Sequence, residues 1–428
     1  MTYIITFGLI SLFFLGVPIA TSLGLSALVA FVVEQGTRTN VPMIAQRMMY
    51  GINNFVLLAV PLFILSARLM NTSGITDRLF RFATTLVGFL PGGLGHANCV
   101  GSLIFAGMSG AAVADAAGLG QVEIKAMDDA GYDHEFSVAI TAASSTIGPI
   151  FPPSIPMVIY GLVGGVSVGR LFLGGVVPGM LMTGALMLMV GCYAHRRGYP
   201  RSPFPTLAGV ALATAHALLP LLTPAILLGG IWTGWFTPTE AAGVAVVYAL
   251  ILGTMIYREL GWKDVVRVFI DSARDTAALG FIVAAASFYG WLLMRTGIPG
   301  RIVSTLLGIS QDWLVLMLII NLLLLIVGCF FETIVALLIL GPILLEVTSK
   351  VGIDPVHFGV VMVLNLMIGL LTPPFGVVLF VMQQVGNISF ERVVRATAPF
   401  IVPLVLVLAL ISVFPPLVTW LPDAVMGK

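Results

Sequence analysis

The sequence predicts an all-α polytopic membrane protein built from two inverted repeats. Apolar residues make up 59% of the chain and charged residues 9%, whereas soluble domains have about 45–50% and about 25%. Apolar stretches recur along the chain, and each is long enough to cross ~30 Å of hydrocarbon. The second half also repeats glycines, prolines and aspartates of the first in one register. The solvent is therefore expected to be lipid, and the net charge of +1 gives no reason to expect a nucleic-acid partner.

Nine segments are predicted to cross the bilayer. The first is interpreted as a span and not as a cleaved signal peptide, because it lacks a basic start and an Ala-x-Ala site. Short loops rich in Lys and Arg are placed on the cytoplasmic side. The predicted spans are 3–33, 54–72, 136–163, 171–194, 207–232, 239–257, 276–294, 356–385 and 398–421.

Two further apolar segments, 93–130 and 313–349, are too long for one crossing. Each has a glycine-containing break near its middle, Gly107–Gly110 in the first and Gly328–Phe331 in the second. We interpret each segment as a re-entrant helical hairpin. The alternative is a pair of ordinary crossing helices.

An internal repeat relates the two halves. Without a gap, residues 107–153 and 328–374 share Gly107/Gly328, Leu119/Leu340, Gly120/Gly341, Gly131/Gly352, Asp133/Asp354, Ile147/Ile368, Gly148/Gly369, Pro152/Pro373 and Pro153/Pro374. The repeats are assigned to 1–195 (hairpin 93–130, broken helix 136–163) and 236–428 (hairpin 313–349, broken helix 356–385), with 196–235 as a linking span. Inverted repeats with broken helices are typical of secondary transporters.

Both broken helices contain a proline pair, within 144–154 and within 366–374. Proline removes a backbone donor and interrupts the helix ladder, and a carbonyl freed in the membrane needs a partner. Carbonyl and hydroxyl oxygens suit a hard monovalent cation such as Na⁺. The alternative is a kink that serves packing alone. The candidate cation ligands are Ser109, Gly110, Asp115, Ser145, Thr146, Gly148, Pro152, Gly328, Glu332, Thr333, Gly369, Thr372 and Pro374, and the candidate substrate contacts are Ser144, Ser154, Asn365 and Gly376.

Two acids, Asp115 and Glu332, lie inside the otherwise apolar hairpins. Intramembrane acids are costly and usually functional, although either could instead pair with a neighbouring helix end. Helix N-termini at the hairpin tips and breaks carry partial positive charge, so they can hold a substrate carboxylate without a dedicated arginine.

Other motifs point away from an enzyme. No phosphate-binding loop or His-Glu-x-x-His motif is present, so neither ATP use nor zinc proteolysis is expected. Asp128, Asp129 and Asp133 faintly resemble an aspartate-rich prenyl-transfer motif, but we interpret them as a solvated loop. Thr237 and Glu240 are predicted to form a capping box with proline at the first helical position.

At these residues the chain resembles the large membrane subunit of tripartite ATP-independent periplasmic (TRAP) transporters. The resemblance runs in order through Val60–Leu65, Gly107–Gly120, Ile147–Ser154, Phe236–Ala242 and Gly369–Gly376. One difference lies at the first hairpin tip. The family often has Gly-Ser-Ser there, whereas this chain has Gly110 followed by two alanines.

The resemblance implies a Na⁺-coupled importer of organic anions in the bacterial inner membrane that works by an elevator mechanism, as in the ion-transporter superfamily. It further implies two partners, a small four-helix membrane subunit and a periplasmic substrate-binding protein. The remaining alternative in the same class is a stand-alone Na⁺/dicarboxylate symporter. A membrane-embedded transferase using Asp128, Asp129 and Asp133 is the alternative from another class.

Overall fold

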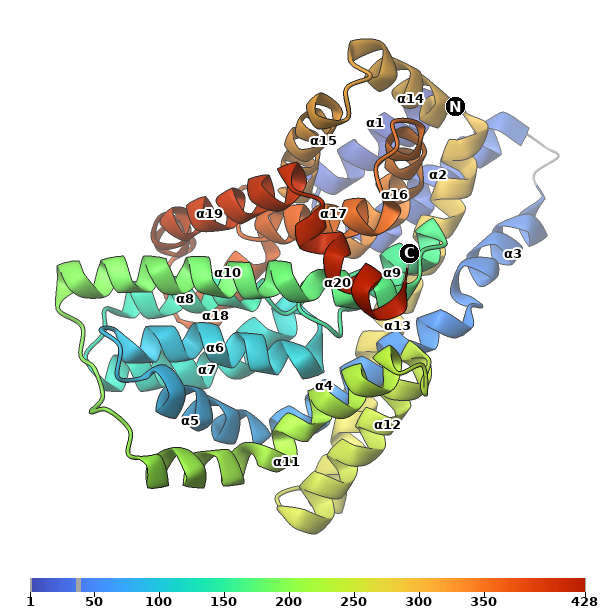
Figure 1. Ribbon diagram of the computed structural model, residues 1–428. Coiled ribbons are helices and arrows are strands. Elements are labelled where there is room, and N and C mark those ends of the chain that lie inside the picture. The colour runs from blue at the N-terminus through green and yellow to red at the C-terminus, as the bar shows by residue number, and fades with distance from the viewer. Residues whose placement is uncertain (1, 36–39, 428) are drawn as a thin grey trace.

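Helices account for nearly all the regular structure in the computed structural model, which describes residues 2–35 and 40–427. Figure 1 shows their arrangement. The first half contains α1 (Thr2–Phe14), α2 (Ile19–Gln35), α3 (Val41–Ile52), α4 (Ala59–Thr72), α5 (Ile75–Val87), α6 (Gly93–Ser109), α7 (Ala112–Asp129), α8 (His134–Ser145), α9 (Ile155–Gly164) and α10 (Val168–Arg197). After α11 (Leu207–Trp232), the second half contains α12 (Pro238–Leu250), α13 (Trp262–Arg295), α14 (Ile298–Ile309), α15 (Trp313–Gly328), α16 (Thr333–Lys350), α17 (Pro355–Gly369), α18 (Val377–Val385), α19 (Phe390–Val413) and α20 (Pro416–Met426).

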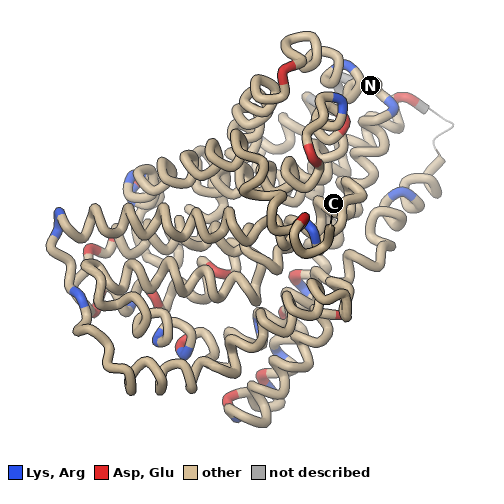
Figure 2. Tube along the Cα trace, in the orientation of Figure 1, with Lys and Arg blue, Asp and Glu red and all other residues tan. Residues whose placement is uncertain are grey.

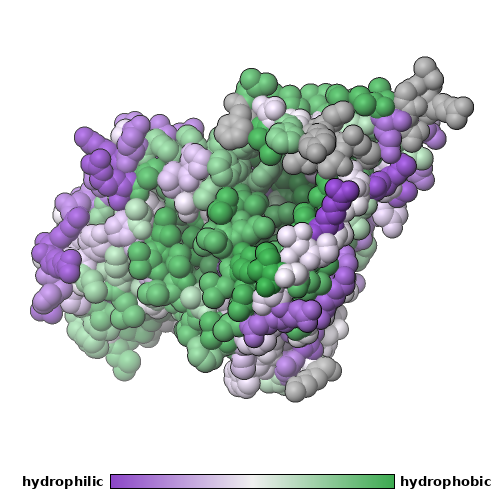
Figure 3. Space-filling view, turned by 90° about the horizontal axis from the view of Figure 1, so that it is seen from above, coloured by the Kyte–Doolittle hydropathy of each residue, from purple (hydrophilic) through white to green (hydrophobic). Residues whose placement is uncertain are grey.

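The surface has the pattern of a protein embedded in lipid. Within the described ranges, seven helices are long and apolar enough to cross a membrane. Most Lys and Arg residues lie near the edges of the molecule in Figure 2. In the space-filling view a broad apolar face separates two hydrophilic edges (Figure 3). The predicted membrane class and all-α fold are therefore confirmed for the part of the chain that the structure describes.

Two predicted spans were wrong because the chain turns inside them. Segment 3–33 forms two helices, α1 and α2, which fold back on each other, so that a methyl group at Gly8 would lie 3.6 Å from Cβ of Ser26. The turn between them contains Gly16 at φ +77°, in the left-handed region that favours glycine, followed by Pro18. Segment 398–421 is divided between α19 and α20 at Pro415, which cannot continue the hydrogen-bond ladder of α19.

The span predicted at 276–294 starts too late. The helix that contains it, α13, already begins at Trp262, and the backbone N–H of Gly261 donates to the Asp264 carboxylate at its start (3.2 Å). Charged residues in its first turns lower the hydropathy of this part without lowering its helix propensity. The prediction therefore left out most of the part of α13 that lines the cavity described below, Asp264 to Asp275.

The same order of elements occurs in both halves. A helix pair (α6 and α7, or α15 and α16) is followed by an interrupted helix (α8 and α9, or α17 and α18) and then by a long helix (α10 or α19). In the first half α6, α7, α8 and α10 lie side by side (Figure 1). The opposite membrane orientation of the two halves stays a prediction.

Candidate functional site

Each hairpin tip is bonded to the break of its own half. In the first half the backbone N–H of Ile155, at the start of α9, donates to the Gly110 carbonyl (3.2 Å). In the second half the N–H of Phe375 donates to the Cys329 carbonyl (3.3 Å). These bonds use backbone groups that the proline-rich breaks release from the helix ladders. Hairpin tip and break therefore form one structural unit in each half.

Glycines allow this close approach. Gly110 ends α6 at φ +63°, and a methyl group there would lie 2.5 Å from the Pro153 carbonyl oxygen. In the second half a methyl group at Gly369 would lie 2.5 Å from the carbonyl carbon of Gly328. No side chain could be added at either place without separating the tip from the break.

Asp115 lies in the first tip and is 2% exposed. Its Oδ1 accepts a hydrogen bond from the Ser109 hydroxyl, and its Oδ2 has no hydrogen-bond partner. A methyl group at Gly148, in the break, would lie 2.2 Å from that free oxygen. The fold thus brings Ser109, Asp115 and Gly148 together, as expected of one oxygen-rich site.

Glu332 in the second tip has a different position. Its carboxylate caps α16 by accepting from the backbone N–H groups of Ile334 (3.0 Å) and Val335 (3.4 Å). This is the helix-end pairing that the sequence left open as an alternative for either acid. The next residue, Thr333, is buried, and its hydroxyl has no partner.

The hydroxyls predicted in the breaks bond within their own helices. Those of Ser145 and Thr146 donate to the carbonyls of Ala142 (2.8 Å) and Ala143 (2.6 Å). The Thr372 hydroxyl donates to the Ile368 carbonyl at 2.9 Å. Their lone pairs stay free to accept or to coordinate, so their assignment as cation ligands stays a prediction.

The remaining predicted residues have structural contacts. Ser154 caps α9, where its Oγ accepts from the Met157 N–H (3.2 Å), and Gly376 starts α18 at φ +35°. Pro152 is buried and Pro374 is exposed. The two predicted substrate contacts Ser144 and Asn365 bond to asparagines of the hairpins, Ser144 to Asn98 (2.6 Å) and Asn365 to Asn321 (2.8 Å), away from any described cavity.

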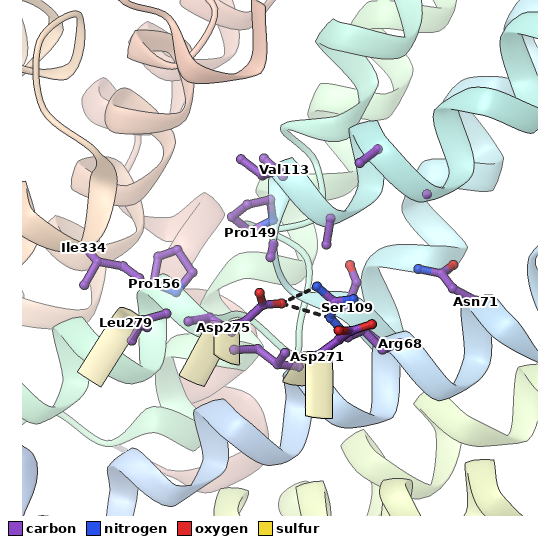
Figure 4. A pocket seen from close by; sticks show the side chains of 18 of the residues that line it. Arg68, Asn71, Ser109, Val113, Pro149, Pro156, Asp271, Asp275, Leu279 and Ile334 are labelled. Atoms are coloured by element: carbon purple, nitrogen blue, oxygen red, sulfur yellow. Dashed lines mark hydrogen bonds and ion pairs between the residues drawn. The ribbon is translucent and has the colours of Figure 1, made fainter. Parts of the chain in front are cut away.

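A cavity of about 700 Å³ lies between the two hairpin tips and the helix pair α4 and α13. Of the predicted site residues it is lined by Ser109, Glu332 and Thr333. The first residues of α7, α9 and α16 also line it, so three helix N-termini face the same space. In Figure 4, Pro149 and Pro156 lie above, and Asp271 and Asp275 below.

The wall formed by α4 and α13 was missed by the sequence analysis. The guanidinium of Arg68 on α4 donates to the Asp275 carboxylate on α13 (Nε to Oδ2 2.9 Å), and both side chains are about half exposed. Asn71, Arg267 and Asp271 also line this wall. One signal was available, because Arg68 is a charged residue within a predicted span, and such residues usually mark a functional site.

Comparison with known proteins identifies the family. Residues 6–417 match the family model described as "Tripartite ATP-independent periplasmic transporter, DctM component". The chain belongs to this TRAP transporter family. Its membership confirms the resemblance stated above and makes the chain a multi-pass subunit of a membrane transporter.

Relatives of the TRAP subunit cover nearly all of it. It is 47% identical to the sialic acid TRAP transporter large permease protein SiaM of Vibrio cholerae, over 98% of both chains. It is 42% identical to the sialic acid TRAP transporter permease protein SiaT of Haemophilus influenzae, over 96% of this chain and 66% of SiaT. It is 36% identical to the C4-dicarboxylate TRAP transporter large permease protein DctM of Vibrio cholerae, over 98% of this chain and 96% of that protein.

A solved structure supports the same fold. The YdaH transporter of Alcanivorax borkumensis superposes on this TRAP subunit with a TM-score of 0.60, over 91% of each chain, at 15% sequence identity. At that identity the likeness shows the fold alone. The two proteins thus share their overall fold over most of each chain.

Two smaller predictions concern the ends of helices. The capping box at α12 is confirmed, because the Thr237 side chain accepts from the Glu240 N–H and Glu240 accepts in return from the Thr237 N–H.

The aspartates considered for a transferase have separate partners, since Asp128 bonds to His134 whereas Asp133 bonds to Tyr199 and Arg197. Hydrogen bonding from Tyr199, together with Arg197, lowers the pKa of Asp133, as in a structural ion pair.

Proposed function

We propose that the chain is the large transmembrane subunit of a Na⁺-coupled TRAP transporter that imports an organic anion, most simply a carboxylate. The observation that carries this proposal is the meeting of three helix N-termini, those of α7, α9 and α16, at one cavity. Helix N-termini carry a partial positive charge, which favours anions. Ser154 and Glu332 cap α9 and α16, whereas α7 has no side-chain cap, so its first N–H groups are the proposed donors to the anion. Arg68 and Arg267 also line this cavity, so the proposed carboxylate site combines a helix N-terminus with positive side chains of the wall.

Na⁺ binding is proposed at the junctions of hairpin tips and breaks. At the first junction the free oxygen of Asp115 is buried and has no cation partner among the described residues. A buried carboxylate without a partner is costly, and a bound Na⁺ would remove that cost. At the second junction the backbones of Gly328 and Gly369 meet, and carbonyl oxygens there are the proposed ligands.

Sialic acid is the first anion to test. The relatives named for sialic acid are 47% and 42% identical to the chain, whereas the C4-dicarboxylate relative from Vibrio cholerae is 36% identical. Other carboxylates follow in the same assay.

The proposed transport cycle uses an elevator movement in the bacterial inner membrane. Helices α4 and α13 form the static wall, and the hairpins with the broken helices form the mobile unit that carries anion and Na⁺. The proposed partners are a small four-helix membrane subunit and a periplasmic substrate-binding protein.

Reconstitution in proteoliposomes tests the proposal. The chain, its small membrane subunit and the loaded binding protein are expected to take up labelled anion when an inward Na⁺ gradient is imposed without ATP. Uptake that persists after collapse of the Na⁺ gradient would refute Na⁺ coupling. Full uptake by the chain alone, together with no co-purifying small subunit, would instead favour the stand-alone symporter.

A further inference from the structure

A second buried acid of the first hairpin, Glu123 on α7, has no part in the site described above. Its side chain is 1% exposed and lies between α6 and α8. Its Oε2 accepts from the amide of Asn98 (2.6 Å), and the same amide nitrogen donates to the Thr141 hydroxyl (2.7 Å). The Ser144 hydroxyl donates to Oδ1 of Asn98 (2.6 Å). These four residues form a closed polar cluster, here named the Glu123 cluster.

The second carboxyl oxygen of Glu123 is buried and has no partner. Among the described residues no Lys, Arg or His forms an ion pair with it. An isolated carboxylate in an apolar interior costs far more free energy than a neutral acid, so such a group takes up a cation or a proton.

The amide of Asn98 bears on this choice. Its nitrogen lies between Oε2 of Glu123 and Oγ1 of Thr141, so a cation cannot bridge these two oxygens. Its N–H bond to Oε2 suits a neutral or an ionised acid, whereas turning the amide over would place its oxygen against Oε2 and would require a proton there. Both arrangements of the cluster accept a neutral Glu123, and neither leaves room for Na⁺ between these atoms.

The surroundings contain few other groups that can exchange protons. His96 and Cys99 on α6 are buried, and Nδ1 of His96 has no partner. Asp115 lies two helical turns before Glu123 on α7. Neither α18 nor the part of α8 from Phe136 to Ser145 has a titratable residue. The charged residues of α5, which packs against the same hairpin, are Asp77, Arg78 and Arg81, and none is buried.

The acid of the cluster is specific to the first half. In the register that aligns the repeats, Ser144 corresponds to Asn365, which bonds to Asn321 of the second hairpin (2.8 Å), so both halves link hairpin and broken helix through polar side chains. Glu123 and Thr141, in contrast, correspond to the apolar Leu344 and Met362. Such a link therefore forms without an acid in the second half, and the acid in the first half needs a separate explanation. The last member of the cluster, Ser144, lies in the final turn of α8, directly before the break.

We propose that Glu123 is a proton-binding site of the first hairpin, which holds one proton in the resting protein and is connected through Asn98 and Ser144 to the break. The ligand is H⁺, and the site is distinct from the Na⁺ and anion sites proposed above. Loss of the proton would place a charge inside the cluster and disturb the end of α8. The protonation state of Glu123 thereby controls the geometry of the break.

Infrared spectroscopy tests this without a transport assay. The full chain in lipid nanodiscs, labelled with carbon-13 at the glutamate carboxyl, is measured in H₂O and D₂O at neutral pH. A label-sensitive C=O band of a protonated acid is expected in the parent protein and in Glu346→Gln, a control at an exposed glutamate. The part of that band due to Glu123 is expected to be lost in Glu123→Gln, a substitution that keeps the size of the side chain and replaces the acid by an amide.

Two outcomes would overturn the proposal. One is an unchanged protonated-acid band in Glu123→Gln, or a loss confined to the ionised-carboxylate bands. The other combines two results: the protonated-acid band of the parent disappears when NaCl is added, and Glu123→Gln loses part of the Na⁺-dependent increase in melting temperature. Together these results would make the cluster a Na⁺ site. If the variant does not fold, the NaCl titration of the labelled parent decides alone. A glutamic-acid band that exchanges slowly and persists in NaCl supports proton binding at Glu123, and loss of that band refutes it.

Discussion

The free oxygen of Asp115 lies so close to Gly148 that a methyl group on the glycine would be 2.2 Å from it. One side of this contact is the first hairpin and the other is the break between α8 and α9. The contact makes glycine necessary at the place where the proposed cation would bind.

Substitution Gly148→Ala is expected to abolish the Na⁺-dependent increase in melting temperature, because the added methyl must displace the Asp115 carboxylate. Bound ligand stabilises only a site that exists in the folded state. The control is Gly184→Ala on α10, where a methyl meets nothing within 4 Å, and replacing glycine in a helix by alanine stabilises by roughly 0.5–1 kcal/mol. An unchanged Na⁺ shift in Gly148→Ala would remove Asp115 from the site.

Substitution Asp115→Asn removes the negative charge of this side chain and keeps its shape, so it tests whether the charge binds Na⁺. The amide can still accept the Ser109 hydrogen bond, but it cannot neutralise Na⁺. Melting curves are expected to show a protein at least as stable as the parent without Na⁺, since a buried unpaired carboxylate is removed, and no further gain with Na⁺. The exposed Asp129→Asn should keep the parent's response. A variant that is less stable in both conditions would indicate that the carboxylate serves packing.

The pair Arg68 and Asp275, in the wall formed by α4 and α13, is expected to change the affinity of the cavity for an anion. Substitution Arg68→Met should raise the apparent K for the anion, whereas Asp275→Asn should leave it equal or lower it, because a negative charge leaves the cavity wall. Unfolding free energy should change little, since half-exposed pairs contribute about 0–1 kcal/mol. Uptake assays on both variants, with the exposed Arg81→Met as control, check the opposite signs. Equal losses in both would assign the pair to folding.

His134 makes stability depend on pH. Its Nδ1 lies 2.6 Å from the Asp128 carboxylate and its Nε2 lies 2.6 Å from the Gly386 carbonyl, and two acceptors favour the imidazolium form, in which both nitrogens donate. Partial burial lowers the pKa of His134. The hydrogen bond to the Gly386 carbonyl and the interactions with Asp128 raise the pKa by more than burial lowers it, so the pKa lies above its ordinary value.

The sign of the pH effect follows from this raised pKa. The His134 contribution is fully present below the ordinary histidine pKa and is lost as the pH rises through the raised folded-state pKa. Melting temperature is expected to fall as the pH rises above the ordinary histidine pKa of about 6.5, and to fall less in His134→Gln. The control His195→Gln, at the end of α10, should keep the parent's pH dependence. A His134→Gln curve parallel to that of the parent would contradict the prediction.

Local chemistry predicted the elements around the site. Glycine at the tips and proline in the breaks act on the backbone of their own segment, so Gly110 and Pro152 could be placed from the sequence. Hydropathy is also a local property, because it is summed over neighbouring residues, and it predicted that the chain is a membrane protein. It did not locate the turn at Gly16, because both helices around the turn are apolar and one long apolar run has the same average.

Contacts across the fold could not be predicted. The cavity wall depends on α4 meeting α13, and no local pattern relates Arg68 to Asp275, which is 207 positions away. The polar contacts of Glu123 could not be predicted either, because its sequence neighbours indicate only a hairpin helix. Its partners Asn98 and Thr141 lie on two other helices and contact it only in the folded protein.

Of the three helix N-termini at the cavity, only that of α7 has no side-chain cap, because Ser154 caps α9 and Glu332 caps α16. An anion at the proposed site would therefore meet backbone N–H groups of α7, and these groups are the same whatever side chains follow them. Recognition of this kind distinguishes a charge from its absence but hardly one carboxylate from another. Side chains of the cavity wall can therefore change through evolution without loss of anion binding, provided that α7 still begins where it does. A family built on such a backbone cradle can acquire new cargo by changing the cavity wall, and relatives named for sialic acid and for C4-dicarboxylates can share one architecture.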